Sequence, residues 1–176
     1  MDPRGKEMLL TRSEIDRRVN DLAGQISRDY AGCDLLLIGV LKGAFIFMAD
    51  LARALSIPCQ TDFIRAASYG AGSESSGTIV ITKDVDAEVR GRDVLIIEDI
   101  IDTGLTLRHI VDTLMLRQPK SIKVCAFLDK RRRRKIPFEA DYVGFSMEDG
   151  FVVGYGLDFN EQDRHWPDVY VIPNPV

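Results

Sequence analysis

The sequence is poor in the residues that build several common kinds of site. It has only three cysteines (Cys33, Cys59 and Cys125) and two histidines (His109 and His165). An odd number of widely spaced cysteines suits neither a disulfide framework nor a zinc ribbon, so we expect each to be a small, buried apolar residue. Unpaired thiols indicate a reducing, cytoplasmic location. Two histidines leave little material for a histidine metal cage or a serine-hydrolase triad.

Long hydrophobic runs are also missing. No stretch reaches the roughly 20 apolar residues that cross a bilayer, because charges such as Lys42 and Asp50 interrupt the longest runs. The first ten residues, MDPRGKEMLL, carry an acid at position 2 and no long apolar region, which argues against a secretory signal. We therefore expect no membrane association.

Neither sign of charge dominates. The 23 Lys and Arg residues against 27 Asp and Glu residues give a net charge of −4, and 45% of the 176 residues are hydrophobic. That length and composition predict one folded domain with its own core rather than a disordered chain. Mild acidity argues against a protein that coats nucleic acid through bulk charge. Residues 130–135 contradict this trend locally, because they read KRRRRK.

The pattern of apolar residues predicts an α/β domain. Thr11-x-x-Glu14 resembles a capping box before an amphipathic helix, and a second and third helix are expected over residues 44–55 and 105–117. Residues 35–40 (LLLIGV) and, after its first residue Asp93, the segment 93–97 (DVLII) are apolar without alternation, which is typical of parallel strands buried on both faces. Further strands are expected at residues 60–65, 78–82, 121–128, 142–145 and 169–172. Strands that alternate with helices indicate a mostly parallel sheet.

One segment between the expected strands is rich in glycine and serine. Residues 66–77 read AASYGAGSESSG, with few apolar side chains to anchor them. Such a composition predicts a mobile loop, and long loops within compact domains often act as lids.

The most informative segment is residues 94–107, VLIIEDIIDTGLTL, in which a buried strand leads through acids and a turn into a helix. Ligands of open α/β sheets bind at the carboxyl ends of strands, and a helix N-terminus there suits a phosphate. Gly104 allows close approach of the backbone, and the hydroxyls of Thr103 and Thr106 can donate to phosphate oxygens. A Walker P-loop is excluded, since no Gly-Lys-Ser/Thr follows.

The acids in this segment require a different partner, because carboxylates beside a phosphate would repel it. Glu98 and Asp99 could accept hydrogen bonds from a sugar diol or hold Mg²⁺ through water. The segment therefore predicts a site for a phosphorylated sugar. The alternative is that Glu98, Asp99 and Asp102 only cap the helix that follows.

This segment resembles the phosphoribosyl pyrophosphate loop of the type I phosphoribosyltransferases. Its Glu-Asp-Ile-Ile-Asp-Thr-Gly form is similar to that of the members acting on hypoxanthine and guanine. Four further segments match the family in order: Leu41-Lys42-Gly43, Ser68-Tyr69, Lys130, and residues 151–158 (FVVGYGLD). Together with Arg164, the resemblance extends over residues 35–164.

The resemblance implies a fold, a reaction and an assembly. The fold is a single domain over residues 1–176, with a core at about 20–150, a flexible lid loop at 66–78, and a small hood from the two terminal segments. The reaction is Mg²⁺-dependent transfer of 5-phosphoribosyl from phosphoribosyl pyrophosphate to hypoxanthine or guanine, which yields IMP or GMP and pyrophosphate in purine salvage. A homodimer or homotetramer is expected, without nucleic acid as a partner.

The resemblance also implies a role for each matching residue. Asp102 is the catalytic base, Glu98 and Asp99 bind the ribose diol, and the 5′-phosphate is bound by Thr103, Gly104, Leu105 and Thr106. Pyrophosphate is bound by Leu41, Lys42, Gly43 and Arg164. Ser68 and Tyr69 belong to the lid. The purine is bound by Lys130, Phe151, Val152 and Asp158, and the metal by Glu98, Asp99 and Asp158. Some relatives carry Lys where this chain has Leu105, a change that keeps a backbone donor but removes a charge.

Several alternatives remain open at this level. Lys42 could be a surface lysine in a turn, Phe151 a core aromatic, and Arg164 part of a surface salt bridge. Phosphoribosyltransferase-like folds also occur in RNA- and DNA-binding regulators, for which residues 130–135 would form a basic patch. Among purines, Lys130 favours a 6-oxo group over the amino group of adenine, whereas xanthine is not excluded. Arg134 resembles a family arginine at a subunit contact.

Overall fold

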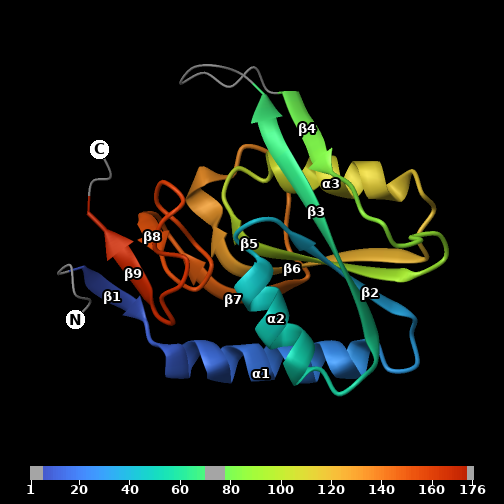
Figure 1. Ribbon diagram of the computed structural model, residues 1–176, viewed down its shortest axis with the longest axis horizontal. Coiled ribbons are helices and arrows are strands. Elements are labelled where there is room, and N and C mark those ends of the chain that lie inside the picture. Colours follow the sequence, from blue (N-terminus) through green and yellow to red (C-terminus); the bar gives the residue numbers. More distant parts are fainter. Residues whose placement is uncertain (1–5, 70–77, 174–176) are drawn as a thin grey trace.

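The computed structural model describes residues 6–69 and 78–173 (Figure 1). Within them the elements are, in order, β1 (Glu7–Leu10), α1 (Arg12–Asp29), β2 (Leu35–Val40), α2 (Phe45–Ala54), β3 (Cys59–Tyr69), β4 (Thr78–Lys83), β5 (Asp93–Ile101), α3 (Leu105–Met115), β6 (Ser121–Lys130), the 3₁₀ turn η1 (Arg131–Arg133), β7 (Tyr142–Met147), β8 (Phe151–Val153) and β9 (Val169–Ile172). None of these helices is long and apolar enough to span a membrane.

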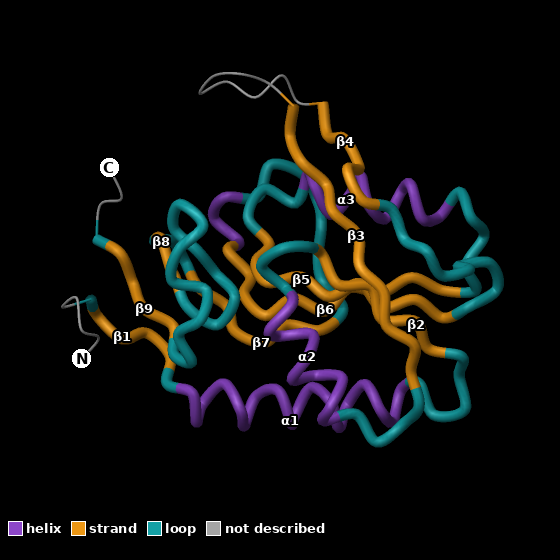
Figure 2. The backbone as a smooth tube through the Cα atoms, in the orientation of Figure 1, coloured by secondary structure: helices purple, strands orange, loops and turns teal. Residues whose placement is uncertain are grey.

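The larger sheet has the strand order β4-β3-β2-β5-β6-β7. All its neighbouring strands are parallel except the β3–β4 pair, which confirms the predicted α/β fold. Helices α1 and α2 cover one face, and α3 covers the other (Figures 1 and 2). Every residue of β2 is buried because both faces are covered. Leu35 and Leu37 pack on the α1/α2 side, whereas Leu36 and Ile38 pack on the α3 side.

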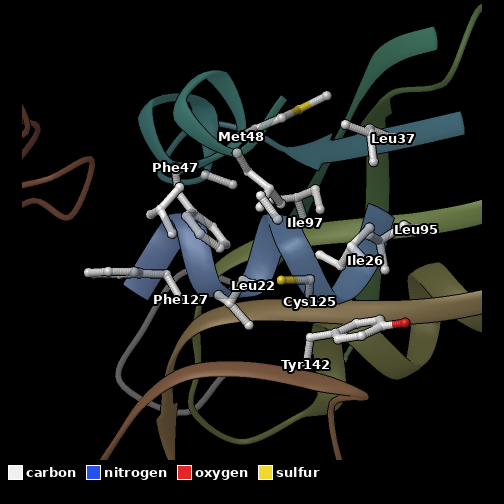
Figure 3. Packing of buried hydrophobic residues seen from close by; sticks show 14 of the residues in the cluster. Leu22, Ile26, Leu37, Phe47, Met48, Leu95, Ile97, Cys125, Phe127 and Tyr142 are labelled. Carbon is white, nitrogen blue, oxygen red and sulfur yellow. The ribbon is translucent and has the colours of Figure 1, made fainter. Parts of the chain in front are cut away.

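Phe127 belongs to the core beneath α1 and α2 (Figure 3) and contacts three other aromatic rings. Its ring centroid lies 5.5 Å from that of Phe47, 5.7 Å from Phe145 and 4.8 Å from Tyr155. Phe127 precedes Lys130 on β6 by three residues. This cluster of aromatic rings therefore fixes the strand end that carries a predicted purine-binding residue.

The smaller sheet has the order β1-β9-β8, and both pairs are antiparallel. It joins a segment near the N-terminus to two segments near the C-terminus (Figure 1). The predicted boundary of the core at about residue 20 falls inside α1. Ile15 and Val19 already pack in the main core, so α1 belongs to it from its first turn.

The structure corrects several predicted boundaries. Residues 66–69 were expected in a loop but continue β3, where Ala67 pairs with Val80 and Tyr69 with Thr78. Residues 70–77 lie outside the described part. Strands β5 and β6 are longer than predicted, so Glu98, Asp99 and Lys130 belong to strands. Strands β1 and β8, of four and three residues, were not predicted.

The prediction that all three cysteines are buried is confirmed only for Cys125. All three are free thiols, and Cys125 is fully buried in the main core. Cys33 and Cys59 are partly exposed, although both pack against the same core. Their positions beside strand starts at the rim of the sheet explain the difference, since solvent reaches that rim.

The predicted capping box is present at the start of α1 and gives a first test. The backbone N–H of Glu14 donates to the Thr11 hydroxyl at 3.3 Å, and the Glu14 carboxylate accepts from the Thr11 N–H at 2.8 Å. We expect Thr11→Ala to lower the free energy of unfolding by about 1 kcal/mol, measured by urea denaturation. Thr11→Ser keeps the hydroxyl and should retain most of the stability. Equal losses in the two variants would contradict this explanation.

Candidate active site

Most predicted site residues lie at the carboxyl ends of β2, β5 and β6, in β8 and in the segment that follows β8. Two adjoining cavities of about 220 Å³ each lie there. The first, here called the turn cavity, is lined by Val40, Glu98, Ile100, Ile101, Asp102, Thr103, Gly104, Thr106 and Leu107. The second, here called the base cavity, is lined by Asp99, Ile100, Asp102, Lys130, Arg133, Phe151, Val152, Leu157 and Asp158. Asp102 borders both.

The turn before α3 has the conformation expected of a phosphate-binding turn. Gly104 is the N-cap of α3 with a φ of 82°, a left-handed conformation that favours glycine. A Cβ there would also lie 3.2 Å from Arg134 and from Phe138. Leu105 is partly exposed, and its N–H donates weakly to the Thr103 hydroxyl at 3.4 Å. The first N–H groups of a helix lack partners within it, so this turn can offer them to an anion.

The two acids at the end of β5 are in low-polarity surroundings. Burial raises the pKa of Glu98 well above its usual value, and the neighbouring Asp99 carboxylate raises it further. Burial also raises the pKa of Asp99. Two backbone N–H groups donate to them, Asp99 to Glu98 at 3.2 Å and Ile100 to Asp99 at 2.8 Å. The pair therefore favours a ligand that brings hydroxyl donors or positive charge.

The Leu41-Lys42-Gly43 turn lies directly against these acids. A Cβ on Gly43 would lie 1.6 Å from Oδ2 of Asp99, so only glycine leaves room for that carboxylate. The Leu41–Lys42 peptide bond is cis. The structure thus places the predicted pyrophosphate turn beside the predicted ribose acids.

Across the turn, the segment after β8 completes this side of the site. A Cβ on Gly156 would lie 2.2 Å from the carbonyl oxygen of Gly43, and Arg164 donates to the Gly156 carbonyl at 2.7 Å. Arg164 also pairs with Asp158 at 2.8 Å, and Lys42 pairs with Glu161 at 2.9 Å. Arg164 thus makes salt bridges, as the alternative expected, and one of its partners is Asp158, which lines the base cavity.

The predicted metal ligands do not form one chelating cluster. In residues 6–69 and 78–173, no three His, Cys, Asp or Glu side chains converge tightly enough to hold a metal by themselves. Asp158 is engaged on both oxygens, by Arg164 and by the N–H of Glu161 at 2.8 Å. A metal at Glu98, Asp99 or Asp158 would need ligands from water or from a bound molecule.

The base cavity combines a buried cation, an acid and an aromatic ring. Lys130 is buried, and burial lowers its pKa, while the charge of Asp102 opposes that shift. Its Nζ lies 5.9 Å from the centre of the Phe151 ring. Phe151 is partly exposed and lines the cavity, so it is not merely a core aromatic. Val152 is buried beside it.

Asp102 has two carboxylate oxygens in different surroundings. Oδ2 lies 3.2 Å from Nη1 of Arg133. Oδ1 is buried and has no hydrogen-bond partner within the described part of the chain. Such an oxygen is an acceptor available to a ligand in the cavity.

The four arginines of residues 130–135 all form ion pairs with acidic side chains of this chain. Arg131 and Arg134 both pair with the buried Asp129. Arg132 lies 3.6 Å from Glu148. Arg134, expected at a subunit contact, also donates to the Asp102 carbonyl at 3.1 Å, and its side chain is only 14% exposed. Through Arg134 the run supports the turn before α3, while the side chains of Arg131 and Arg132 stay 74% and 72% exposed.

Two residues of this site, Glu161 and Arg133, were not predicted from the sequence. Glu161 bridges Lys42 and Arg164, and the hydrogen bond from Lys42 lowers its pKa. Arg133 reaches Asp102. Arg133 lies among identical neighbours, so no sequence signal distinguishes it. The one sequence feature that could have indicated Glu161 is its position between two predicted site residues, Asp158 and Arg164.

The predicted lid residues lie at the end of β3. Ser68 pairs with Ile79 and Tyr69 with Thr78 in the β3–β4 ladder, which projects beyond the body of the sheet (Figures 1 and 2). Of the predicted lid, residues 70–77 lie outside the described residues.

Comparison with known proteins agrees with this geometry. The chain is 48% identical over 172 residues to the hypoxanthine-guanine phosphoribosyltransferase of Aquifex aeolicus, covering 96% of this chain and 97% of that protein. It is 46% identical to the enzyme of the same name from Bacillus subtilis, covering 97% and 95%.

Solved structures give the same result. A hypoxanthine phosphoribosyltransferase from Staphylococcus aureus superposes with a TM-score of 0.92 at 42% identity, covering 96% of this chain and 91% of that one. A hypoxanthine-guanine phosphoribosyltransferase from Bacillus anthracis, with a HEPES molecule in its active site, has a TM-score of 0.91 at 42% identity and covers 96% and 99%. The family model of the phosphoribosyl transferase domain matches residues 6–160. With the site and the fold both in agreement, this chain belongs to the phosphoribosyltransferase family.

Proposed function

We propose that this chain transfers the 5-phosphoribosyl group of phosphoribosyl pyrophosphate to hypoxanthine or guanine, forming IMP or GMP and pyrophosphate in purine salvage. The observation that carries the proposal is the base cavity. Three separate segments bring Asp102, Lys130 and Phe151 to one cavity, and that cavity adjoins the turn before α3. This arrangement provides a proton acceptor, a donor to an oxo group and a flat apolar face for one bicyclic base.

The donor's 5′-phosphate binds at the turn before α3. Backbone N–H groups from Thr103 to Thr106 and the threonine hydroxyls surround the phosphate oxygens, and the helix dipole adds positive potential. Leu105 contributes its N–H but no charge. The left-handed Gly104 keeps the backbone close to the anion.

Glu98 and Asp99 bind the ribose diol. Their carboxylates have few donors in the described structure, and hydroxyl groups would supply them. The same hard oxygen atoms suit Mg²⁺, which Glu98, Asp99 and Asp158 would hold through water and through the donor's own oxygens. When bound, Mg²⁺ would neutralise charge on the departing pyrophosphate. The turn of Leu41, Lys42 and Gly43 and the guanidinium of Arg164 supply further donors to that anion.

The purine stacks on Phe151 with its oxo edge towards Lys130. The Lys130 ammonium group donates to O6, and a 6-amino group would direct hydrogens at this donor instead. Val152 offers backbone groups to the opposite edge of the base, and Asp158 lies on the same side of the cavity. Lys130 therefore selects 6-oxopurines over adenine.

In the chemical step, N9 of the purine bonds to the anomeric carbon while the bond from that carbon to pyrophosphate breaks. The purine loses a ring proton, which Asp102 accepts on Oδ1, and the bond electrons leave with pyrophosphate. Positive charge develops at the anomeric carbon, as in glycoside hydrolysis. Closure of the segment that includes Ser68 and Tyr69 would exclude water at this stage. The active assembly is proposed to be a homodimer or homotetramer.

A panel of four purines tests the proposal. Hypoxanthine, guanine, xanthine and adenine are each incubated with phosphoribosyl pyrophosphate and Mg²⁺, and nucleotide formation is followed by absorbance. We expect IMP or GMP to form readily and AMP not to rise above background. Preferred turnover of adenine, or no turnover of any purine, would overturn the assignment.

A further inference from the structure

Asp102 is held on two sides by consecutive arginines. Arg134 donates to its backbone carbonyl at 3.1 Å, and Arg133 pairs with Oδ2 of its carboxylate at 3.2 Å. The first contact fixes the main chain of the turn, and the second fixes the side-chain torsion. Neither contact involves Oδ1, which is the buried oxygen without a partner among the described residues.

The other arginines of the run have different acidic partners. Arg131 and Arg134 pair with Asp129, and Arg132 pairs with Glu148. Arg133 alone among these four pairs with the Asp102 carboxylate, and it also lines the base cavity. Its side chain is 52% exposed, so the core does not require it. The position of Arg133 is therefore explained by Asp102 and the base cavity rather than by packing.

A carboxylate that accepts a purine proton must present one oxygen to the ring in a fixed direction. A misplacement of about 1 Å can lower a rate by roughly 100-fold. An Asp side chain that is free to rotate would divide its time between presenting either oxygen and turning both away. The ion pair on Oδ2 removes this freedom and leaves Oδ1 as the acceptor. Arg133 also places a second cation beside Lys130 at the same edge of the cavity.

We propose that Arg133 is a positioning residue, which holds the Asp102 carboxylate so that Oδ1 faces the purine ring proton. The proposal rests on the function proposed above, because it assigns a task to the proton acceptor of that reaction. It predicts that loss of Arg133 lowers the rate of the chemical step and changes purine affinity less.

The test compares Arg133→Ala with Arg132→Ala in steady-state turnover of hypoxanthine. Arg132 is the adjacent residue of the same 3₁₀ turn, its side chain is 72% exposed, and it pairs with Glu148 instead. We expect Arg133→Ala to lower kcat by roughly 10- to 100-fold with a smaller change in the hypoxanthine KM, whereas Arg132→Ala keeps the wild-type kcat. Arg133→Lys, which keeps the cation, should recover part of the loss.

A double-mutant cycle separates positioning from a general effect on structure. In an Asp102→Asn background the partner charge is already gone, so Arg133→Ala should change the residual kcat by no more than about twofold. Thermal unfolding of each variant checks that it folds, and Arg133→Gln replaces the alanine variant if that one does not.

The outcomes distinguish the two proposals. Absence of wild-type turnover would reject the proposed function. Normal wild-type turnover with equal kcat values for Arg133→Ala and Arg132→Ala would reject the positioning role. A fully multiplicative loss in the Asp102→Asn background would reject it as well, because Arg133 would then act independently of Asp102.

Discussion

Asp102→Asn is expected to lower kcat for IMP formation by roughly 10²- to 10⁴-fold, the usual contribution of a general base. Asparagine has nearly the same shape, but its amide cannot accept a proton at neutral pH. It also removes the negative charge that pairs with Arg133 and that opposes the lowering of the Lys130 pKa. Rapid-quench measurement of a single turnover would report the chemical step itself, free of product release.

Binding of the donor provides the control for this variant. The turn before α3 and the Leu41–Gly43 turn keep all their groups in Asp102→Asn, so calorimetry should give a dissociation constant for phosphoribosyl pyrophosphate close to that of the wild type. Unchanged single-turnover rates would exclude Asp102 as the base. A large loss of donor affinity would instead show that the residue holds the ribose side of the site.

Gly43→Ala should raise the KM for phosphoribosyl pyrophosphate by about 100-fold. The new methyl group would lie 1.6 Å from Oδ2 and 2.4 Å from Cγ of Asp99, so the carboxylate and the turn cannot both keep their positions. Asp99 also lines the base cavity, but the proposed purine contacts come from Lys130, Phe151 and Val152, so we expect the KM for hypoxanthine to change much less. Initial rates with each substrate varied in turn would measure both constants.

Gly24→Ala is the matched control for the glycine variant. A Cβ at position 24 would meet only the end of Arg28, at 3.6 Å, and alanine is favoured over glycine within a helix such as α1. This variant should be at least as stable as the wild type and equally active. Donor KM values that are the same in Gly43→Ala and Gly24→Ala would refute the close approach of Gly43 to Asp99.

Local patterns predicted much of the fold, because its central strands are buried on both faces. The run Leu35–Val40 is apolar throughout, which is typical of a parallel strand covered on both sides. The Thr11–Glu14 box fixed the start of α1 for a similarly local reason. The short strands β1 and β8 carry no such signal, because each is stabilised by pairing with β9 at a distant point of the chain.

Site residues could be predicted where one short motif contains the groups that bind the ligand, as the turn at Gly104 does. Contacts between distant segments could not be predicted in this way. The close approach of Gly43 to Asp99 and the pairing of Lys42 with Glu161 depend on how strands stack in the sheet. Arg133 is the clearest case, since only the direction of its side chain distinguishes it from Arg132.

The order of the small sheet has a consequence for how the protein is made. Strand β8, which carries Phe151 and Val152, pairs with β9, and β9 in turn pairs with β1. During translation, residues 35–115, which contain β2, β3, β5 and α3, emerge before β9 has been synthesised. The turns at Leu41–Gly43 and Gly104 are thus synthesised first, whereas the first of them gains its packing partner Gly156 later, and the strand that carries Phe151 and Val152 gains its supporting strand only after residues 169–172 have emerged.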